Sequence, residues 1–180
     1  MMAKVYFSLG SNKGDRLDFI LRAIRQLEKT IGSLVANSSV FESEPWGFTA
    51  DTAFYNMVVQ FNTKMSSAEL LASVTEAELK LGRSRDGNGY SSRTIDIDIL
   101  FVDQMLVKSE TLAIPHPRMH LRRFVLEPLL EISPEMIHPL FNITVFDLMK
   151  VCQDTSALQV VLSREAFFKQ YTTFKQTVSN

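Results

Sequence analysis

The sequence has few of the features that mark secreted, membrane-embedded or polyanion-binding proteins. It contains a single cysteine, Cys152, which excludes an intramolecular disulfide and a thiolate zinc site. Its 19 basic residues are matched by 20 acidic ones, so the net charge of -1 leaves no cationic excess for a nucleic-acid backbone. The apolar runs are too short to cross a bilayer, and the Met-Met-Ala-Lys start is not followed by a signal-peptide pattern. We therefore expect a cytoplasmic protein that binds neither nucleic acid nor membranes.

Glycine and proline are also scarce, at 7 and 6 residues, and no linker-like or repetitive stretch divides the chain. Hydrophobic residues account for 46% of the sequence and charged residues for 22%, which is typical of a globular protein. We expect one domain over residues 1–160 and a C-terminal extension over 161–180. In that extension, Phe167, Tyr171 and Phe174 recur at helical spacing and predict a helix. We expect a monomer, with a dimer formed through the extension as the alternative.

Hydrophobic periodicity predicts strands and helices in a definite order. The predicted elements are a strand over 5–9, a helix over 17–31, strands over 35–41 and 55–63, a helix over 66–82 and a strand over 95–102. Ser66 and Glu69 form the sequence pattern of a capping box, and Gly82 is a typical helix stop. This order favours a split βαβ sandwich, in which helices cover one face of a mostly antiparallel sheet, over a doubly wound parallel sheet.

The strand predicted over 95–102 carries the clearest chemical signal, because its side chains are expected to alternate strictly between two faces. Asp96 and Asp98 share one face, with their Cα atoms roughly 7 Å apart, and isoleucines occupy the other. Two carboxylates this close raise each other's pKa unless a cation lies between them. Mg²⁺ suits such a pair, since it takes one or two carboxylates and completes its shell with water and phosphate oxygens. The alternative is an ordinary solvated strand face, because Asp-x-Asp is a common pattern.

Three arginines precede this strand within one short segment. Arg83, Arg85 and Arg93 lie between the end of the second predicted helix and the acidic strand. Because a guanidinium can bind two phosphate oxygens at once, arginines facing metal-binding carboxylates would hold a polyphosphate from both sides. We favour this interpretation; the alternative is a hydrated surface turn.

Other residues indicate what would surround such a phosphate site. Glu78 lies on the apolar stripe of the second predicted helix, where it would contact a ribose hydroxyl or pair with a neighbouring arginine. His116 lies between two prolines that stiffen its backbone, so its imidazole would contact a phosphate or simply be hydrated. Aromatic residues near an amide indicate a second pocket for a flat heterocycle: Phe54, Asn56 and Phe124. By default, each phenylalanine would be a core residue.

These motifs together resemble one enzyme family, the 6-hydroxymethyl-7,8-dihydropterin pyrophosphokinases of folate biosynthesis. The resemblance runs from about Val5 to about Leu140. Its most specific element is Arg93-Thr94-Ile95-Asp96-Ile97-Asp98-Ile99. The supporting motifs, in chain order, are Gly10-Ser11-Asn12, Pro45-x-Gly47, Phe54-x-Asn56, Glu78 with Gly82-Arg83, Pro115-His116 and Arg122-x-Phe124.

The resemblance implies a fold, a reaction and roles for particular residues. The fold would be α+β and ferredoxin-like, and the reaction would move an intact diphosphate from ATP to the hydroxymethyl group of the pterin, releasing AMP. Asp96 and Asp98 would hold two Mg²⁺ ions, while Arg83 and Arg93 would stabilise the transferring group. The residues implied to bind ATP are Glu78, Arg85, Tyr90, Ile99, His116 and Arg122. Those implied to bind the pterin are Ser43, Pro45, Trp46, Phe54, Asn56 and Phe124.

The chain departs from the family pattern at two places. Tyr90-Ser91-Ser92 stands where many relatives carry Trp-Gly-Pro, which should make the arginine segment more flexible. Thr111 stands where bacterial members often carry another arginine, so one contact to ATP is expected to differ.

Two functions from other classes compete with this interpretation. A nucleotidyltransferase also uses two strand aspartates but usually carries a Gly-Ser turn shortly before them, whereas Gly10-Ser11 lies far upstream here. A non-catalytic RNA-binding module of the same fold would show aromatic residues and basic charge on its open sheet face, where this chain has acid.

Overall fold

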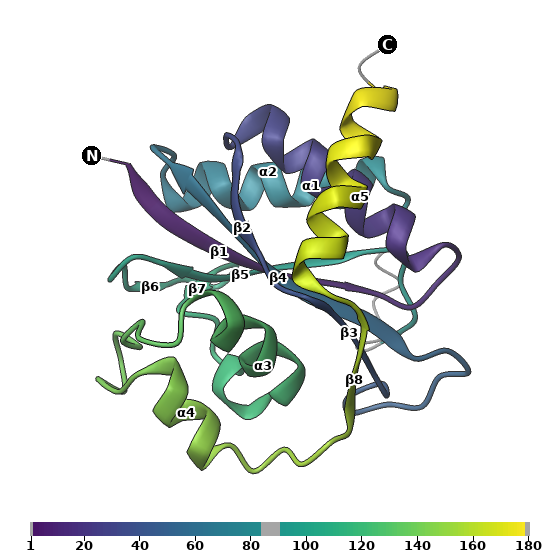
Figure 1. Ribbon diagram of the computed structural model, residues 1–180. Coiled ribbons are helices and arrows are strands. Elements are labelled where there is room, and N and C mark those ends of the chain that lie inside the picture. The colour runs from purple at the N-terminus through teal and green to yellow at the C-terminus, as the bar shows by residue number, and fades with distance from the viewer. Residues whose placement is uncertain (1, 84–90, 179–180) are drawn as a thin grey trace.

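The computed structural model of the protein, shown in Figure 1, describes residues 2–83 and 91–178. An antiparallel sheet lies between two groups of helices. In chain order the elements are β1 (Ala3–Ser11), α1 (Arg16–Thr30), β2 (Leu34–Asn37), β3 (Val40–Ser43), β4 (Phe54–Thr63), α2 (Ser67–Lys80), β5 (Asp96–Val102), β6 (Val107–Lys108), β7 (Ala113–Ile114), the short 3₁₀ helix η1 (Met119–Leu121), α3 (Arg123–Ile132), α4 (Val145–Val151), β8 (Leu158–Leu162) and α5 (Arg164–Val178).

The main sheet has the strand order expected of a split βαβ sandwich. Five of its six strands lie in the order β5-β1-β4-β3-β8, and the sixth, β2, also pairs with β4. β1 is an interior strand, with β4 on one side and the edge strand β5 on the other, and both pairs are antiparallel. The predicted α+β, ferredoxin-like class is thereby confirmed. This order places the first strand directly beside the acidic strand β5.

The strand predicted over 35–41 is in fact two strands, β2 and β3. They are separated by Ser38 and Ser39, whose side chains form hydrogen bonds to backbone groups both near and far along the chain. The Ser38 hydroxyl donates to the Ser39 carbonyl at 2.7 Å and accepts from the Val58 backbone N–H at 2.9 Å. The Ser39 hydroxyl accepts from the Arg164 N–H at 3.1 Å. β-Branched content alone could not indicate this break.

Helices cover both faces of the sheet rather than one. On one face, β1 contributes Val5, Phe7 and Leu9 to a core shared with α1, α2 and α5. On the other face, Tyr6 and Phe101 pack with side chains of α3 and α4. The prediction of a one-faced helix layer was wrong because α3 and α4 follow the six elements on which it was based.

β5 also departs from the strict alternation expected over its whole length. Its register with β1 shifts between Tyr6 and Phe7, which is the signature of a β-bulge. Consequently Leu100 and Phe101, although adjacent in sequence, both belong to the core under α3 and α4. The bulge lies beyond the two aspartates, so it leaves their shared face intact.

Helix α2 begins and ends as its sequence predicts. The Ser66 backbone N–H donates to the Glu69 carboxylate at 2.7 Å, and the Ser66 hydroxyl accepts from the Glu69 N–H at 3.4 Å, which together form a capping box. After the helix, Gly82 adopts a φ of +76°, a left-handed conformation that favours glycine. This turn directs the chain from α2 into the arginine segment.

The C-terminal region joins the main fold through β8 and α5. β8 pairs antiparallel with β3, and α5 places Phe167 and Tyr171 in the same core as α1. The Tyr171 hydroxyl donates to Glu28 of α1 at 2.7 Å, and the Lys175 ammonium lies 2.9 Å from the same carboxylate. The division at residue 160 stays a prediction, and β8 runs across that position.

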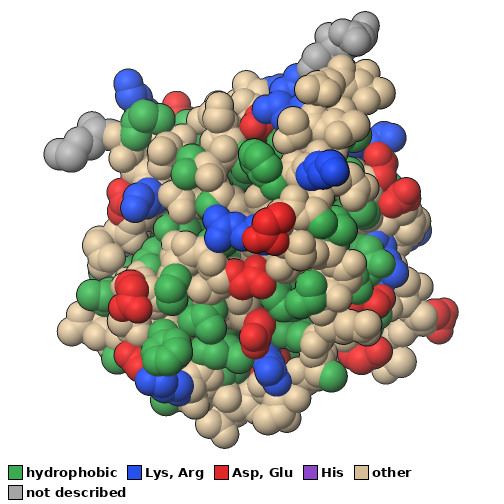
Figure 2. All heavy atoms as spheres, in the orientation of Figure 1, with side chains coloured by type: hydrophobic (Ala, Val, Ile, Leu, Met, Phe, Trp, Pro, Cys, Tyr) green, Lys and Arg blue, Asp and Glu red, His purple; other side chains and the backbone are tan. Residues whose placement is uncertain are grey.

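The visible surface carries charges of both signs. Figure 2 shows basic and acidic side chains interspersed over this face of the molecule, in keeping with the net charge of -1. Hydrophobic side chains gather over its lower half, around α3 and α4. Within the described residues, the helices are all too short or too polar to cross a membrane.

Candidate active site

The two aspartates lie two residues apart on β5, the edge strand of the main sheet next to β1. Asp96 is opposite Gly10 of β1, and Asp98 is opposite Ser8. Both side chains are partly exposed, whereas Ile97 and Ile99 between and beyond them are buried. Gly10 allows a close approach here, because a Cβ at that position would lie 3.3 Å from Oδ1 of Asn56. The sequence prediction that Asp96 and Asp98 share one face is confirmed.

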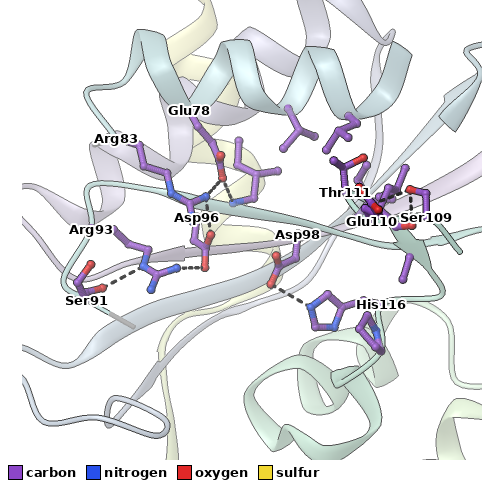
Figure 3. Close-up of a pocket in the computed structure, with 17 residues that line it drawn as sticks. Glu78, Arg83, Ser91, Arg93, Asp96, Asp98, Ser109, Glu110, Thr111 and His116 are labelled. Atoms are coloured by element: carbon purple, nitrogen blue, oxygen red, sulfur yellow. Dashed lines mark hydrogen bonds and ion pairs between the residues drawn. The ribbon is translucent and has the colours of Figure 1, made fainter. Parts of the chain in front are cut away.

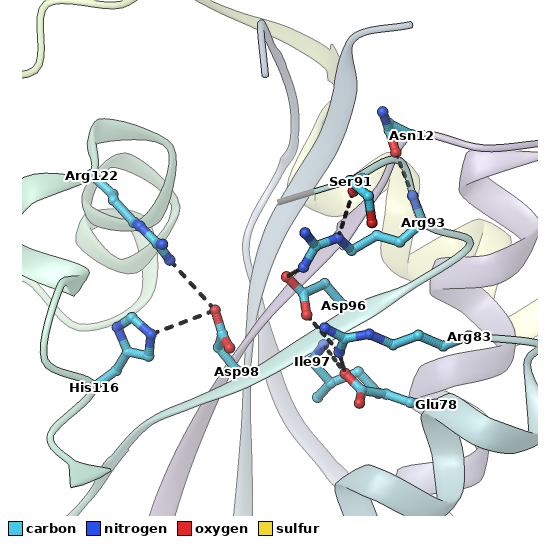
Figure 4. Close-up of polar contacts among 10 residues, drawn as sticks. All are labelled: Asn12, Glu78, Arg83, Ser91, Arg93, Asp96, Ile97, Asp98, His116 and Arg122. Atoms are coloured by element: carbon cyan, nitrogen blue, oxygen red, sulfur yellow. Dashed lines mark hydrogen bonds and ion pairs between the residues drawn. The ribbon is translucent and has the colours of Figure 1, made fainter. Parts of the chain in front are cut away.

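Asp96 is held by arginines from both ends of the arginine segment, as Figure 4 shows. Arg83 lies 2.6 Å from one of its carboxylate oxygens and Arg93 lies 2.6 Å from the other. Arg83 also pairs with Glu78 of α2. Arg83 thus pairs with two carboxylates, and Asp96 pairs with two arginines.

Glu78 is a buried member of this network. Only 2% of its surface is exposed, and its carboxylate accepts a hydrogen bond from the Ile97 backbone N–H at 2.8 Å. Burial raises the pKa of Glu78, while Arg83 and the Ile97 N–H oppose that rise. Of the two roles open to Glu78 from sequence, pairing with an arginine is the one that the structure displays.

Asp98 faces the opposite wall of the site, formed by the chain after β7. His116 Nε2 lies 3.7 Å from its carboxylate, and Arg122 Nη1 lies 3.6 Å away. Burial, followed by the charge of Asp96, raises the pKa of Asp98 to about 7. The positive groups around the Asp96 and Asp98 carboxylates therefore do not fully stabilise a negative charge on both.

His116 is oriented as a neutral hydrogen-bond donor. Its Nδ1 accepts the Arg118 backbone N–H at 3.2 Å, so in the neutral ring the proton is on Nε2, which faces Asp98. Its own backbone N–H donates to the Leu100 carbonyl at 2.9 Å, which ties the residue to β5. Burial, followed by the charges of Arg122 and Arg118, lowers the pKa of His116 to about 4.

A cavity of about 540 Å³ opens beside the aspartates. Figure 3 shows its walls: α2 on one side, β5 below, and the segment with Ser109, Glu110 and Thr111 opposite. Arg83, Arg93 and His116 lie at its polar end, and Leu71, Val74 and Leu112 line its apolar part. The cavity therefore suits a ligand with an apolar, flat end and a strongly anionic end.

A second, much smaller cavity lies on the other side of the aspartates. Its volume is about 50 Å³, room for no more than one or two water molecules. The guanidinium of Arg122 lies 4.9 Å from the centre of the Trp46 ring and 5.7 Å from that of Phe124. Phe48 meets Phe54 edge to face, with ring centres 6.0 Å apart. The residues common to both cavities are Arg93, Asp96 and Asp98.

Comparison with known proteins identifies the family to which this geometry belongs. Residues 6–134 match the model of the 7,8-dihydro-6-hydroxymethylpterin-pyrophosphokinase (HPPK) family. The 2-amino-4-hydroxy-6-hydroxymethyldihydropteridine pyrophosphokinase of Aquifex aeolicus is 40% identical over 141 residues, which cover 78% of this chain and 87% of that protein. The chain belongs to the HPPK family. It is therefore an enzyme, a pyrophosphoryl transferase of folate biosynthesis, as its resemblance implied.

Other HPPK relatives are longer proteins. The folic acid synthesis protein fol1 of Pneumocystis carinii is 40% identical over 141 residues, or 78% of this chain and 19% of that protein. The crystal structure of a Plasmodium falciparum HPPK-DHPS triple mutant with STZ-DHP matches with a TM-score of 0.68 at 16% identity, covering 83% of this chain and 43% of that one. This chain thus spans less than half of those two proteins, and at that identity the structural likeness concerns the fold.

The structure gathers most of the predicted HPPK site residues around the two cavities. The first cavity is lined, among others, by Glu78, Arg83, Arg93, Asp96, Asp98, Ile99 and His116. The second is lined, among others, by Ser43, Trp46, Phe54, Asn56, Arg122 and Phe124. Arg122, expected to contact ATP, thus lines the second cavity. Pro45 lies in the chain between two lining residues without lining the cavity itself. Arg85 and Tyr90 lie outside the described residues.

Sequence reasoning assigned no role to several residues that the structure brings to the site. The segment 109–113 forms a wall of the first cavity, but it is too short and irregular to show a periodic pattern, and the family comparison had marked only Thr111 in it. Phe48 lines the second cavity, and among the protein's 13 phenylalanines nothing in the sequence singled it out. Asn12 accepts a hydrogen bond from the backbone N–H of Arg93. In the sequence, only the motif Gly10-Ser11-Asn12 indicated that Asn12 belongs to the site.

Proposed function

We propose that this protein transfers an intact diphosphate from ATP to 6-hydroxymethyl-7,8-dihydropterin in a Mg²⁺-dependent reaction, giving AMP and the pterin diphosphate. The observation that supports it best is the meeting of a large cavity and a small aromatic one at Arg93, Asp96 and Asp98. A donor and an acceptor bound in these two cavities would meet at the only part of the described site where carboxylates and arginines are concentrated.

The larger cavity is the proposed site for ATP. Its volume of about 540 Å³ lies within the roughly 300–1,000 Å³ typical of small-molecule sites. The adenine would lie against the apolar wall of Leu71, Val74 and Leu112, and the phosphates would lie at the end with Arg83 and Arg93. A neutral His116 offers its Nε2–H to a phosphate oxygen without the need to lose or gain a proton.

The pair of carboxylates fits a Mg²⁺-bound nucleotide. Among the described residues, no three or more His, Cys, Asp or Glu side chains gather as a metal site, so Asp96 and Asp98 would supply two ligands and leave the rest to water and phosphate. The raised pKa of Asp98 is consistent with a carboxylate whose cation is still to bind. Bound Mg²⁺ would neutralise phosphate charge and lower the pKa of a coordinated hydroxyl.

The smaller cavity is the proposed site for the pterin, after rearrangement. At about 50 Å³ it cannot hold a bicyclic ring, so Trp46 and the Arg122 side chain must move to admit one. The space that they leave would be bounded by the rings of Phe54 and Phe124, with the Asn56 amide at the edge. Asn56 already donates to the Ser43 hydroxyl at 2.9 Å, which fixes the direction of its side chain.

The residues of this chain would act by positioning and charge neutralisation. The hydroxyl oxygen of the pterin forms a bond to the β-phosphorus of ATP, and the bond from that phosphorus to the oxygen of the α-phosphate breaks. AMP leaves with that oxygen, and the hydroxyl proton passes to solvent. Arg83 and Arg93 lie where they can bind the moving diphosphate, whose charge is spread over several oxygens during transfer. Their contribution is electrostatic and needs no proton transfer.

Nucleotide analysis tests this proposal. The purified protein is incubated with ATP in four mixtures, with and without Mg²⁺ and with and without the pterin alcohol, and the adenine nucleotides are separated. We expect AMP only when both are present. Formation of ADP would indicate transfer of one phosphoryl group, and pyrophosphate with a nucleotidylated product would indicate a nucleotidyltransferase; either result contradicts the proposal.

A further inference from the structure

Asn12, directly after β1, forms hydrogen bonds through its side-chain amide and its backbone N–H to two loops of the active site. Its Oδ1 accepts the Arg93 backbone N–H at 2.8 Å, as Figure 4 shows, and its own N–H donates to the Arg93 carbonyl at 3.2 Å. Its Nδ2 donates to the Ser92 hydroxyl at 3.0 Å and to the Thr52 carbonyl at 3.2 Å. Only 2% of the residue is exposed, so water does not replace these partners readily.

The two loops that Asn12 joins carry different parts of the site. Arg93 is the last residue of the arginine segment, lines both cavities and pairs with Asp96. Thr52 belongs to the connection between β3 and β4, which carries Trp46 and Phe48 of the second cavity. One amide thus fixes the backbone of a transfer-site arginine relative to the loop that forms the wall of the acceptor cavity.

A neighbouring residue strengthens the same attachment. Arg16, at the start of α1, donates to the Ala53 carbonyl at 2.9 Å and to Glu42 at 2.7 Å. Its guanidinium lies 3.6 Å above the Tyr55 ring. The turn from β1 to α1 therefore holds two consecutive carbonyls of the β3–β4 connection, Thr52 through Asn12 and Ala53 through Arg16.

We propose that Asn12 is a positioning residue for the transfer reaction: by binding Arg93 and Thr52 at once, it holds the arginine and the acceptor-cavity loop in one arrangement. The assignment rests on the proposed function. Asn suits this position because its amide accepts one hydrogen bond and donates two, whereas Asp has no donor, and the shorter Ser side chain has only one hydrogen to donate. Fixing the Arg93 backbone lowers the entropy that its side chain must lose when it binds the transferring group.

Asn37, which lines neither of the two cavities, offers a matched control. It is also buried, with 3% exposed, and its Nδ2 donates to two backbone carbonyls, Ser38 at 3.0 Å and Arg164 at 3.1 Å. Asn37→Ala therefore removes a comparable set of hydrogen bonds without touching Arg93 or Thr52. A general loss of stability should affect both variants alike.

The test is a kinetic double-mutant cycle with Arg93. We expect Asn12→Ala to lower kcat about 10–100-fold, while Asn37→Ala changes kcat less than about twofold at a similar loss of thermal stability. If Asn12 acts through Arg93, then in the Arg93→Ala background Asn12→Ala should cost less than about threefold in kcat. An equal fold loss in both backgrounds, or a loss matched by Asn37→Ala, would overturn the assignment.

Hydrogen exchange provides a second readout that needs no catalysis. Because Asn12 accepts the Arg93 N–H, Asn12→Ala should speed exchange of that amide at least about fivefold, and Asn37→Ala should leave it unchanged. An unchanged Arg93 amide in Asn12→Ala would overturn the proposal. Absence of AMP with the wild-type protein would instead overturn the transfer reaction itself, so the two failures are distinguishable.

Discussion

Arg93 Nη1 lies 2.6 Å from Oδ2 of Asp96. The Asp96 carboxylate, which is proposed to bind Mg²⁺, is therefore already paired with the guanidinium of an arginine that precedes it closely in the sequence. Both side chains are largely shielded from solvent, so salt screens this pair less than it screens a surface salt bridge. In the proposed reaction, binding of Mg²⁺ and ATP would separate the two side chains, and the guanidinium would then face phosphate oxygens. Both partners of the pair would thus exchange to new ligands.

Removal of the Arg93 guanidinium should reduce the rate of transfer rather than the binding of ATP. We expect Arg93→Ala to lower kcat by about 10²–10³-fold, the cost of losing one donor to developing charge, with a much smaller change in the Kd of an unreactive ATP analogue. Steady-state kinetics and isothermal titration would measure the two quantities.

Arg22→Ala is a suitable control for that experiment. Arg22 pairs with Asp18 on the exposed face of α1 and is 57% exposed, so its removal deletes a guanidinium far from the cavities. Its kcat should match that of the wild type. If Arg93→Ala also turns over at the wild-type rate, Arg93 has no part in the transfer.

Asp98 should contribute to function at the expense of stability. Its pKa is raised from 3.8 to about 7, first by burial and then by Asp96, so the folded protein holds this proton more tightly than the unfolded chain. Stability is therefore lost as the pH rises from about 4 through 7. Since a third of the side chain is exposed, the cost at pH 8 is discounted to about 1–2 kcal/mol.

Asp98→Asn removes this cost without a change of shape. At pH 8 the variant should unfold at a temperature roughly 2–8 °C above the wild type, and at pH 4 the difference should vanish, while Mg²⁺-dependent ATP binding is lost. Thermal unfolding at the two pH values in the absence of Mg²⁺ would measure the effect. A variant that is less stable at pH 8 would show that Asp98 is a structural residue.

Helix α5 supplies core residues, and adjacent phenylalanines allow a matched test. Phe167 is fully buried, whereas Phe168 is 55% exposed. Phe167→Ala should lower the free energy of unfolding by about 3–5 kcal/mol, and Phe168→Ala should lower it by less than about 1 kcal/mol. Urea denaturation would measure both. Equal losses in the two variants would contradict the placement of α5 against α1.

His138 should make the protein sensitive to moderate acid. The ring meets Phe101 edge to face and stacks on Phe141, and its Nδ1 accepts the backbone N–H of Leu140 at 3.2 Å. Burial, followed by His120, lowers its pKa from 6.5 to about 4, so between these values the unfolded chain binds the proton and the folded one does not. Stability should fall by about 2 kcal/mol from pH 7 to pH 4.5 through this group alone.

The pH dependence of a variant isolates this contribution. His138→Gln should be less stable than the wild type at pH 7 but should lose less stability between pH 7 and 4.5, as measured by urea denaturation at both. Parallel pH profiles for the two proteins would show that His138 does not titrate in this way.

Sequence alone predicted the parts of this protein that depend on local pattern. The capping box at Ser66, the turn at Gly82 and the shared face of Asp96 and Asp98 follow from neighbouring residues and are confirmed. The family followed from motifs that are short but ordered along the chain. The proposed roles of individual site residues, the cytoplasmic location and the monomeric state stay predictions.

Features that depend on long-range pairing could not be predicted. The break at Ser38 and Ser39 depends on β4 and on Arg164, far away in sequence, and the bulge near Leu100 depends on its register with β1. The position of Arg122 against Trp46 is a matter of side-chain packing between distant loops, so a motif could mark Arg122 but not the cavity that it occupies.

The fate of labelled phosphorus tests the central claim most directly. The protein is supplied with Mg²⁺, the pterin alcohol and ATP labelled at either the α- or the γ-phosphorus, and the products are separated. We predict that the γ label appears in the pterin product and the α label in AMP, since the bond between the α-phosphate oxygen and the β-phosphorus is the one that breaks. The α label in the pterin product, or the γ label there together with ADP, would contradict the account.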